Sequence, residues 1–198
     1  MLNLDYICIK ARKMKKSETN KTLWRIAGTD GLKLGLVSSA YMFLTVMLEK
    51  ADINPVLNSV LTFILWGAKF AGCIWILMLL MKRFCQTNPS AGNSDTFRFG
   101  MLAALLSAFV YSSVSFANVA YISADLYAEQ MDTIMQAYAQ FMDSNMMAEM
   151  EKWTGRMPQL TFVSNMIYCT IYGIVLSFIL SRNIPSRDPF ADYKPDEQ

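Results

Sequence analysis

A lysine stands near the middle of a highly apolar stretch of this chain. The segment FILWGAKFAGCIWILMLLM covers residues 63–81, and its only charged residue is Lys69. An ammonium at the centre of a bilayer costs about 3 kcal/mol on insertion scales, so it should face a protein interior or water. Such a group could hold an anion, carry a proton or contact a lipid headgroup. The structural alternative is that neighbouring side chains solvate Lys69, which then only orients the helices.

The expected partners of Lys69 are polar side chains at the same depth in the other apolar stretches. Trp66, three residues earlier, could also offer its ring face to the cation. We expect no carboxylate within any apolar stretch, so hydroxyls would have to satisfy the ammonium. The candidate midplane site comprises Lys69, Trp66, Ser39, Tyr111, Ser112, Ser115 and Thr170, with Ser38, Tyr41, Tyr168 and Tyr172 at similar depth.

Methionine pairs at helical spacing are a second candidate for chemistry. Met131 with Met135, and Met142 with Met146, are four residues apart and could present two soft sulfurs together. Thioethers bind copper(I), but methionine more often provides adaptable packing. Because the chain has no histidine and no external cysteine is expected, we predict no metal site.

The residue types argue against catalysis. The absence of histidine removes the commonest metal ligand and the usual proton-transfer group near neutral pH. There is no Gly-rich phosphate-binding loop. The cysteines lie in apolar stretches or on the expected cytoplasmic side, so no disulfide framework follows. We therefore expect neither an enzyme nor a cofactor. The cysteines are Cys8, Cys73, Cys85 and Cys169.

Four apolar stretches must position these groups. They cover residues 27–48, 56–81, 99–124 and 160–181, and each could supply the ~20 residues that a helix needs to cross a bilayer. The chain is 54% hydrophobic and 17% charged, which is more apolar and less charged than a typical soluble domain. The sequence predicts an all-α polytopic membrane protein with four transmembrane helices.

Basic residues are distributed unequally between the two sides of these stretches. Eight occur in the N-terminal segment through Lys33, three in the 82–98 loop and three in the tail, whereas the other side has only Lys50, Lys152 and Arg156. Since positive charges collect in the cytoplasm, both termini should be cytoplasmic. The expected parts are a basic cytoplasmic N-terminus (1–26), a four-helix membrane domain (27–182) and a flexible cytoplasmic tail (183–198).

Small residues recur every four positions on each stretch, a spacing that allows close helix packing in membranes. Four such ridges predict a compact bundle, and a homo-oligomer through one of them remains open. The ridges are Gly31, Gly35 and Ser39; Gly67 and Ala71 with Ala68 and Gly72; Gly100, Ala104, Ala108 and Ser112; and Cys169, Gly173, Ser177 and Ser181.

Residues 125–159 form the only long loop expected outside the cytoplasm. Their hydrophobic pattern predicts an amphipathic outer helix over about 125–150. Its apolar face could lie in the headgroup region, cap the bundle or pair with a partner helix. This candidate interaction face carries Tyr127, Met131, Ile134, Met135, Tyr138, Met142 and Met146.

The order of these parts resembles a known family. A cytoplasmic loop leads into TFRFGMLAALLSAFVYSSVSFANVAYI, the acidic amphipathic segment DLYAEQMDTIMQAYAQ follows, and the last span ends in FILSR. In this order the chain resembles the bacterial four-span membrane proteins of domain-of-unknown-function family 4199, over roughly residues 31–182. A proline associated with the end of the third span is replaced here by Ser123-Ala124. The resemblance implies the topology and no activity.

The leading functional hypothesis is a non-enzymatic protein of the bacterial inner membrane. It would act by association with a partner protein or with membrane lipids through the outer face. The alternative is a small transporter or channel subunit that uses Lys69 and the mid-depth hydroxyls, although the sequence shows neither inverted repeats nor broken helices. Nucleic-acid binding is not expected, because orientation and anionic lipid explain the basic N-terminus.

Overall fold

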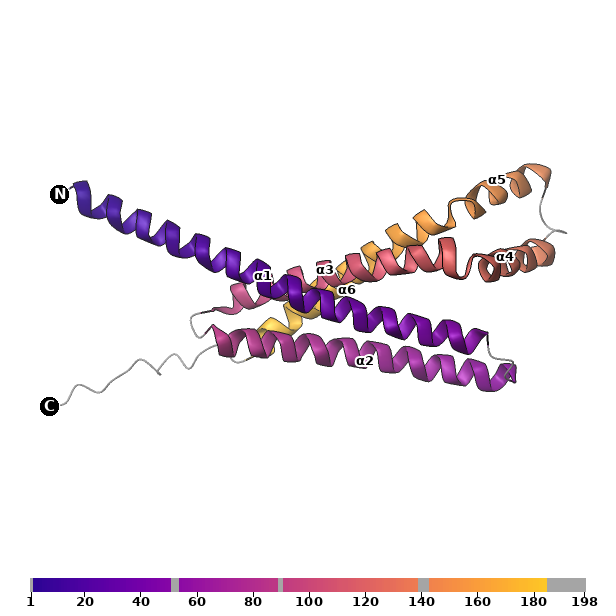
Figure 1. Cartoon of the computed structure of the whole chain (residues 1–198), viewed down its shortest axis with the longest axis horizontal. Helices are drawn as coiled ribbons and strands as arrows, with labels where there is room; N and C mark the ends of the chain where they lie inside the picture. Colours follow the sequence, from indigo (N-terminus) through magenta and orange to yellow (C-terminus); the bar gives the residue numbers. More distant parts are fainter. Residues whose placement is uncertain (1, 51–53, 89–90, 139–142, 185–198) are drawn as a thin grey trace.

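The computed structural model describes residues 2–50, 54–88, 91–138 and 143–184, and it describes side chains from Thr22 onward except those of Glu49, Pro55, Ser144 and Glu151. These residues are helical almost throughout and contain no strand, as the all-α prediction required (Figure 1). The elements are α1 (Leu2–Glu49), α2 (Pro55–Thr87), α3 (Asn93–Ala117), the π-helical turn η1 (Asn118–Ile122), α4 (Ala124–Tyr138), α5 (Ser144–Thr154) and α6 (Met157–Asn183).

Four helices are long and apolar enough to cross a membrane. Local chemistry sets where some of them begin. The Asn54 side chain accepts a hydrogen bond of 3.0 Å from the Val56 backbone N–H, and Pro55 occupies the first turn of α2. Proline suits this position because its missing N–H would have no helical partner there. The four candidate spans are Thr22–Leu48, Val56–Thr87, Asn93–Ile122 and Met157–Asn183.

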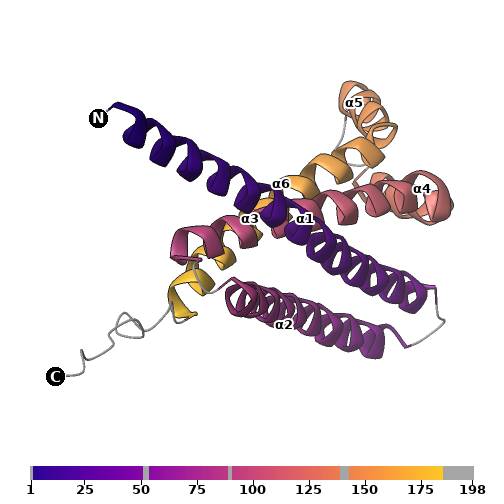
Figure 2. The same ribbon diagram turned by 60° about the vertical axis from the view of Figure 1, so that its left-hand side comes forward.

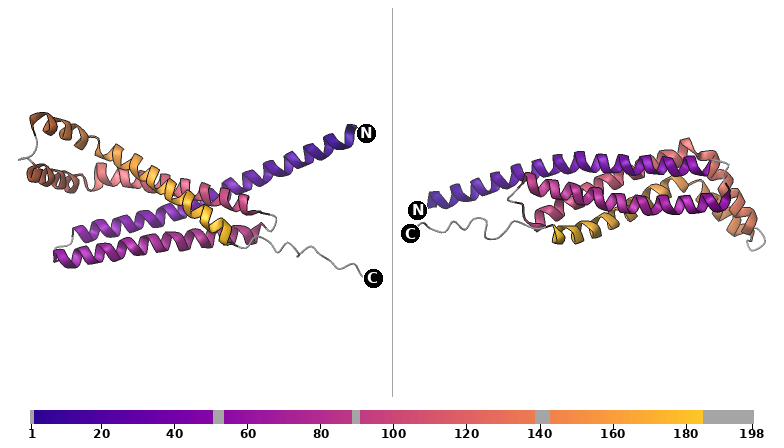
Figure 3. Two further views of the ribbon diagram at one scale, coloured as in Figure 1. Left: turned by 180° about the vertical axis from the view of Figure 1, so that it is seen from behind. Right: turned by 90° about the horizontal axis from the view of Figure 1, so that it is seen from below.

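Helix α3 is the centre of the bundle. It packs along α1 on one side and along α6 on the other, whereas α2 makes fewer contacts, which it shares among α1, α3 and α6. Figures 1 and 2, with the rear view in Figure 3, show α1 and α2 running as one pair across α3 and α6. The two pairs meet near the end of the molecule from which both termini leave, and they diverge toward the other end.

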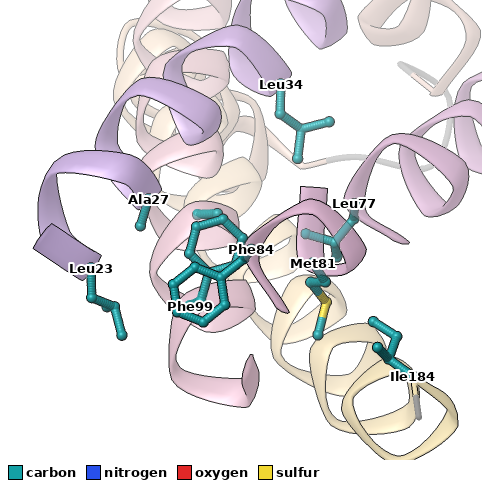
Figure 4. Packing of buried hydrophobic residues seen from close by; sticks show 9 residues of the cluster. Leu23, Ala27, Leu34, Leu77, Met81, Phe84, Phe99 and Ile184 are labelled. Atoms are coloured by element: carbon teal, nitrogen blue, oxygen red, sulfur yellow. The ribbon is translucent and has the colours of Figure 1, made fainter. Parts of the chain in front are cut away.

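A core of larger side chains holds the four helices together where the pairs meet (Figure 4). The rings of Phe84 and Phe99 stack with centroids 4.4 Å apart, and Met81 beside them is fully buried. The cluster is completed by Leu23, Ala27 and Leu34 of α1, Leu77 of α2, Ala103 of α3 and Ile184 after α6. It ties α2 to the bundle at one end.

The predicted small-residue packing is confirmed for α1, α3 and α6. A Cβ atom at Gly31 would lie 2.7 Å from the Ala103 carbonyl oxygen, and one at Gly100 would lie 2.7 Å from the Ser177 hydroxyl. A Cβ at Gly173 would overlap the Ala104 side chain. These backbones approach so closely because the glycines lack side chains.

The same prediction is wrong for α2 within this chain. A Cβ at Gly67 or Gly72 would meet nothing within 4 Å, and Ala68 and Ala71 are at the surface. The bundle-facing side of α2 instead carries larger residues, including Leu77, Met81 and Phe84. These side chains keep the α2 backbone farther from its neighbours, and its small-residue stripe therefore lies on the opposite face.

The outer segment is a helical hairpin, so the prediction of one helix over 125–150 is wrong. Helix α4 ends at Tyr138, and α5 begins at Ser144 and contacts α4. Helix α5 starts here because the Asp143 side chain accepts a 2.7 Å hydrogen bond from the Met146 backbone N–H. A carboxylate at this position caps a helix N-terminus.

The expectation of no carboxylate in the spans is also wrong. Asp30 lies within the span Thr22–Leu48 and is only 6% exposed. Its carboxylate is 3.5 Å from the ammonium of the exposed Lys33. The charge of Asp30 can be accommodated because the residue lies in the N-terminal part of the span. Lys33, one turn later in α1, supplies a counter-charge there. Asp30 does not line the cavity beside Lys69.

Candidate functional site

Lys69 lies on the side of α2 that faces the bundle. Helical periodicity places it one turn before Cys73 and two turns before Leu77, on the face that packs inward. Its ammonium donates a 3.0 Å hydrogen bond to the Tyr111 hydroxyl of α3. The same nitrogen is 4.3 Å from the centroid of the Tyr111 ring. One tyrosine thus offers both a lone pair and a π face to the cation.

A cavity of about 80 Å³ adjoins this pair and is lined by all four candidate spans. Because one water needs at least about 10–15 Å³ on this measure, the cavity has room for several. Most of its wall is aliphatic or aromatic. The lining residues are Leu34 and Ser38 of α1; Lys69, Phe70, Cys73 and Leu77 of α2; Ala104, Ser107, Ala108 and Tyr111 of α3; and Tyr168, Cys169, Tyr172, Gly173 and Leu176 of α6.

Polar contacts join α1 and α2 beside the cavity. The Ser38 hydroxyl is 3.6 Å from the Cys73 sulfur. About one turn farther out on α1, the Tyr41 hydroxyl donates to the Leu65 carbonyl of α2. These contacts hold the middle of α2, where small-residue packing is missing.

The structure brings together only part of the sequence-predicted midplane site. Lys69 and Tyr111 are in direct contact, whereas Trp66 is 56% exposed and contacts the rings of Phe63 and Phe70. The cation–π partner is therefore Tyr111 and not Trp66.

The other four hydroxyls of the predicted midplane site do not line the cavity beside Lys69. Two of them form hydrogen bonds with other groups, and two have buried oxygens without a hydrogen-bond partner in the described part of the chain. The Ser39 hydroxyl donates a 2.8 Å hydrogen bond to the Gly35 carbonyl, and the Ser115 hydroxyl accepts a 2.9 Å hydrogen bond from the Asn165 amide of α6. Ser112 and Thr170 have buried hydroxyl oxygens with no hydrogen-bond partner among the described residues. None of these four lines the cavity.

Sequence reasoning missed Cys73, Cys169 and Ser107 as neighbours of Lys69. Cys73 follows Lys69 by four residues, so helical spacing could have placed it on the same face. Cys169 was assigned only to a packing ridge, although its neighbours Tyr168 and Thr170 were placed at the depth of Lys69. Neither thiol belongs to a metal cluster: no three His, Cys, Asp or Glu side chains gather around a common point in the described part of the chain.

The candidate interaction face is divided between the two outer helices. Tyr127, Met131, Ile134, Met135 and Tyr138 lie on α4, Met146 lies on α5, and Met142 falls outside the described residues. No described residue of α4 is buried, and Ile134 and Tyr138 are 44% and 54% exposed. The helix contacts η1 and α5, and it does not lie across the ends of α1 and α2 (Figures 1 and 3).

Among the described residues, four apolar helices of spanning length surround a small, mostly apolar cavity that contains one lysine, and they define a polytopic α-helical membrane protein. The chain belongs to the family described as Protein of unknown function (DUF4199), whose family model matches residues 29–182. Searches of curated proteins and of solved structures find no match.

Proposed function

We propose that this protein is a non-enzymatic component of the bacterial inner membrane that acts by binding a partner protein through the hairpin α4–α5. The observation that carries the proposal is the uncovered apolar side of α4, where Ile134 and Tyr138 are exposed beyond the membrane-spanning bundle. Exposed apolar faces of amphipathic helices commonly dock into grooves of partner proteins.

Charge favours a protein over a lipid surface as the partner. Residues 124–138 contain Asp125, Glu129 and Asp132 but no Lys or Arg. Helices that lie in a membrane surface usually carry basic residues on the polar face, which attract anionic lipid. An acidic helix instead complements a groove bordered by Lys or Arg. Lipid association therefore remains the less favoured form of this proposal.

Site-specific photocrosslinking in intact membranes tests the proposal. A benzophenone amino acid at position 134 or 138 should give an adduct that contains a second polypeptide. The matched control is position 136, which is about 160–200° away around α4. That position should give little or no adduct.

The charge and apolar contributions can be tested on the same adduct. Ile134→Asp should abolish crosslinking from position 138, whereas Gln136→Asp should leave it unchanged. Raising the salt concentration should weaken crosslinking if carboxylates contribute. Adducts with phospholipid alone at 134 and 138 would contradict a protein partner and support the lipid surface.

A second candidate function is a small transporter or channel subunit. It is supported by the cavity at Lys69, because a charged group in a membrane-spanning bundle commonly marks a pathway. The test is flux in proteoliposomes with an ionic gradient. Transport that is lost in Lys69→Met and kept in Lys82→Met would support this candidate; no flux above that of empty vesicles would count against it.

A further inference from the structure

We propose that the cavity beside Lys69 binds the carboxylate of a membrane amphiphile, of which a long-chain fatty acid is the simplest example. The proposal concerns the same cavity as the transport candidate, but it requires only binding and no movement across the membrane.

The single positive charge of Lys69 favours a ligand with one negative charge. The ammonium of Lys69 contacts the Tyr111 hydroxyl and ring, and no described carboxylate lines the cavity. Asp30, the buried acid of the first span, is paired with Lys33 and does not line the cavity. An ammonium in a low-dielectric interior is strongly stabilised by one counter-charge, whereas a second negative charge would be left uncompensated.

The donor arrangement favours an anion with two acceptor oxygens. The Tyr111 oxygen accepts from Lys69 at 3.0 Å, so the phenolic proton can be donated to another group. A carboxylate placed between the two side chains can accept one hydrogen bond from the ammonium and one from the phenol. Charge-assisted hydrogen bonds of this kind are shorter and stronger than neutral ones.

The size and lining of the cavity favour a carboxylate attached to hydrocarbon. A volume of about 80 Å³ admits a compact head group, and the wall includes Leu34, Phe70 and Leu176. A phosphodiester would bring bulky substituents on two sides. Tyr168 lines the cavity and is also 55% exposed, so the cavity borders a surface that lipid covers. An alkyl chain can leave toward the bilayer at this side.

Equilibrium binding of radiolabelled palmitate to the full-length protein in nanodiscs tests the proposal directly. We expect one saturable site per chain. Lys69→Met should weaken binding roughly 10- to 100-fold, as expected for loss of one charge-assisted hydrogen bond. Lys69→Arg should retain most of the affinity. The matched control is Lys82→Met, which removes an exposed lysine from the same helix and should leave binding unchanged.

Cysteines of this chain supply an independent readout of where the ligand lies. Palmitate should slow alkylation of Cys73 and Cys169, which line the cavity. It should not affect Cys85, whose sulfur is 3.1 Å from the Thr96 hydroxyl outside the cavity. Mass spectrometry of peptides after timed N-ethylmaleimide treatment measures the three rates separately.

Two comparisons identify the chemistry recognised. Methyl palmitate has the same chain without the charge and should neither compete nor protect. Acetate has the charge without the chain and should compete only weakly. Equal binding of the ester, or unchanged palmitate binding in Lys69→Met, would overturn recognition of the carboxylate. Full competition by acetate would overturn the amphiphile and assign the site to a small aqueous anion.

The failure of this inference can be separated from failure of the proposed functions. The hairpin variant Ile134→Asp should bind palmitate normally, because Ile134 is not part of the cavity. Flux is a separate measurement, so a protein that binds palmitate without transporting it would support this inference and count against the transport candidate.

Discussion

The Lys69–Tyr111 pair shows how one residue can make a buried cation tolerable. Tyr111 presents its hydroxyl at 3.0 Å and its ring centroid at 4.3 Å from the same nitrogen. Ring and hydroxyl disperse the charge without themselves being ionised, which avoids burying a second charge. The pair also joins α2 to α3, the central helix, with which α2 makes fewer contacts than α1 or α6 does.

At the residue scale, we predict that Tyr111→Phe destabilises the protein by about 1–3 kcal/mol, because the ammonium loses a hydrogen-bond acceptor in a poorly solvated site. The free energy of unfolding in detergent micelles or bicelles measures this change. Tyr168→Phe is the control, since no hydrogen bond of its hydroxyl is seen among the described residues, and it should change stability by less than about 0.5 kcal/mol. Equal effects of the two substitutions would contradict the assigned role of the Tyr111 hydroxyl.

At the element scale, the four spans differ in how they are held. Helices α1, α3 and α6 pack through small residues, whereas α2 relies on the Phe84–Phe99 stack at one end and on Lys69 and Tyr41 farther along. The stripe of Gly67, Ala68, Ala71 and Gly72 remains at the surface of α2. Substitution of glycines can therefore distinguish internal packing from an uncovered face.

We predict opposite outcomes for two glycine substitutions. Gly35→Ala should destabilise the protein by about 1–3 kcal/mol through overpacking, because the new Cβ would lie 2.7 Å from Val110 Cβ. Gly67→Ala should be neutral or slightly stabilising, because nothing lies within 4 Å. Thermal unfolding of the purified variants compares them. A similar loss of stability for Gly67→Ala would indicate that a second copy of the chain covers the small residues on the surface of α2.

The junction between α3 and α4 sets the direction of the outer hairpin. Asn118 is fully buried in η1, and its side-chain oxygen accepts a 3.1 Å hydrogen bond from the Ser123 hydroxyl. The Ser123 backbone N–H also donates a 2.8 Å hydrogen bond to the Asn118 backbone carbonyl. These bonds close a wide π-helical turn at the point where the apolar span ends.

We predict that Ser123→Ala loosens this junction without unfolding the bundle. Loss of the hydroxyl leaves the Asn118 side chain buried with no partner, at a cost of about 1–3 kcal/mol. Spin labels at Gln136 and Lys50, in a background without native cysteines, should show a broader distance distribution by pulsed electron resonance. Ser164→Ala on the exposed side of α6 is the control and should leave the distribution unchanged.

At the scale of the whole molecule, the charge distribution predicts the orientation in the membrane. The side expected to be cytoplasmic carries fourteen of the eighteen Lys and Arg residues, with Lys69 inside the bundle and three on the other side. Basic residues resist translocation, so the short loop after α2 and both termini should remain in the cytoplasm while α4–α5 is outside.

Reporter fusions test this orientation. Alkaline phosphatase should be active when fused after residue 140 and inactive after residue 90 or 198, and a fluorescent protein that matures only in the cytoplasm should give the reverse pattern. Moving positive charge outward, by substituting lysines at positions 51–53 and removing Lys82 and Arg83, should weaken the preference for this orientation. Phosphatase activity at residue 90 in the native sequence would contradict the predicted topology.

The sequence alone determined the all-α class, the four spans and the family, because runs of apolar residues long enough to cross a bilayer have few structural alternatives. It also singled out Lys69, since an isolated charge in such a run stands out without any structure. The helix start at Asp143 was not predicted, because the apolar periodicity continues past this residue and indicated one outer helix.

Only the tertiary structure decided which faces meet. Helical periodicity orders the side chains around each helix, but it does not say how far each helix is rotated toward its neighbours. The rotation of α2 turns Lys69 and Cys73 inward and its glycines outward, and that of α6 brings Cys169 to the same cavity. Tyr111 rather than Trp66 receives the cation for the same reason. These rotations depend on the packing of all four helices together, which no single segment encodes.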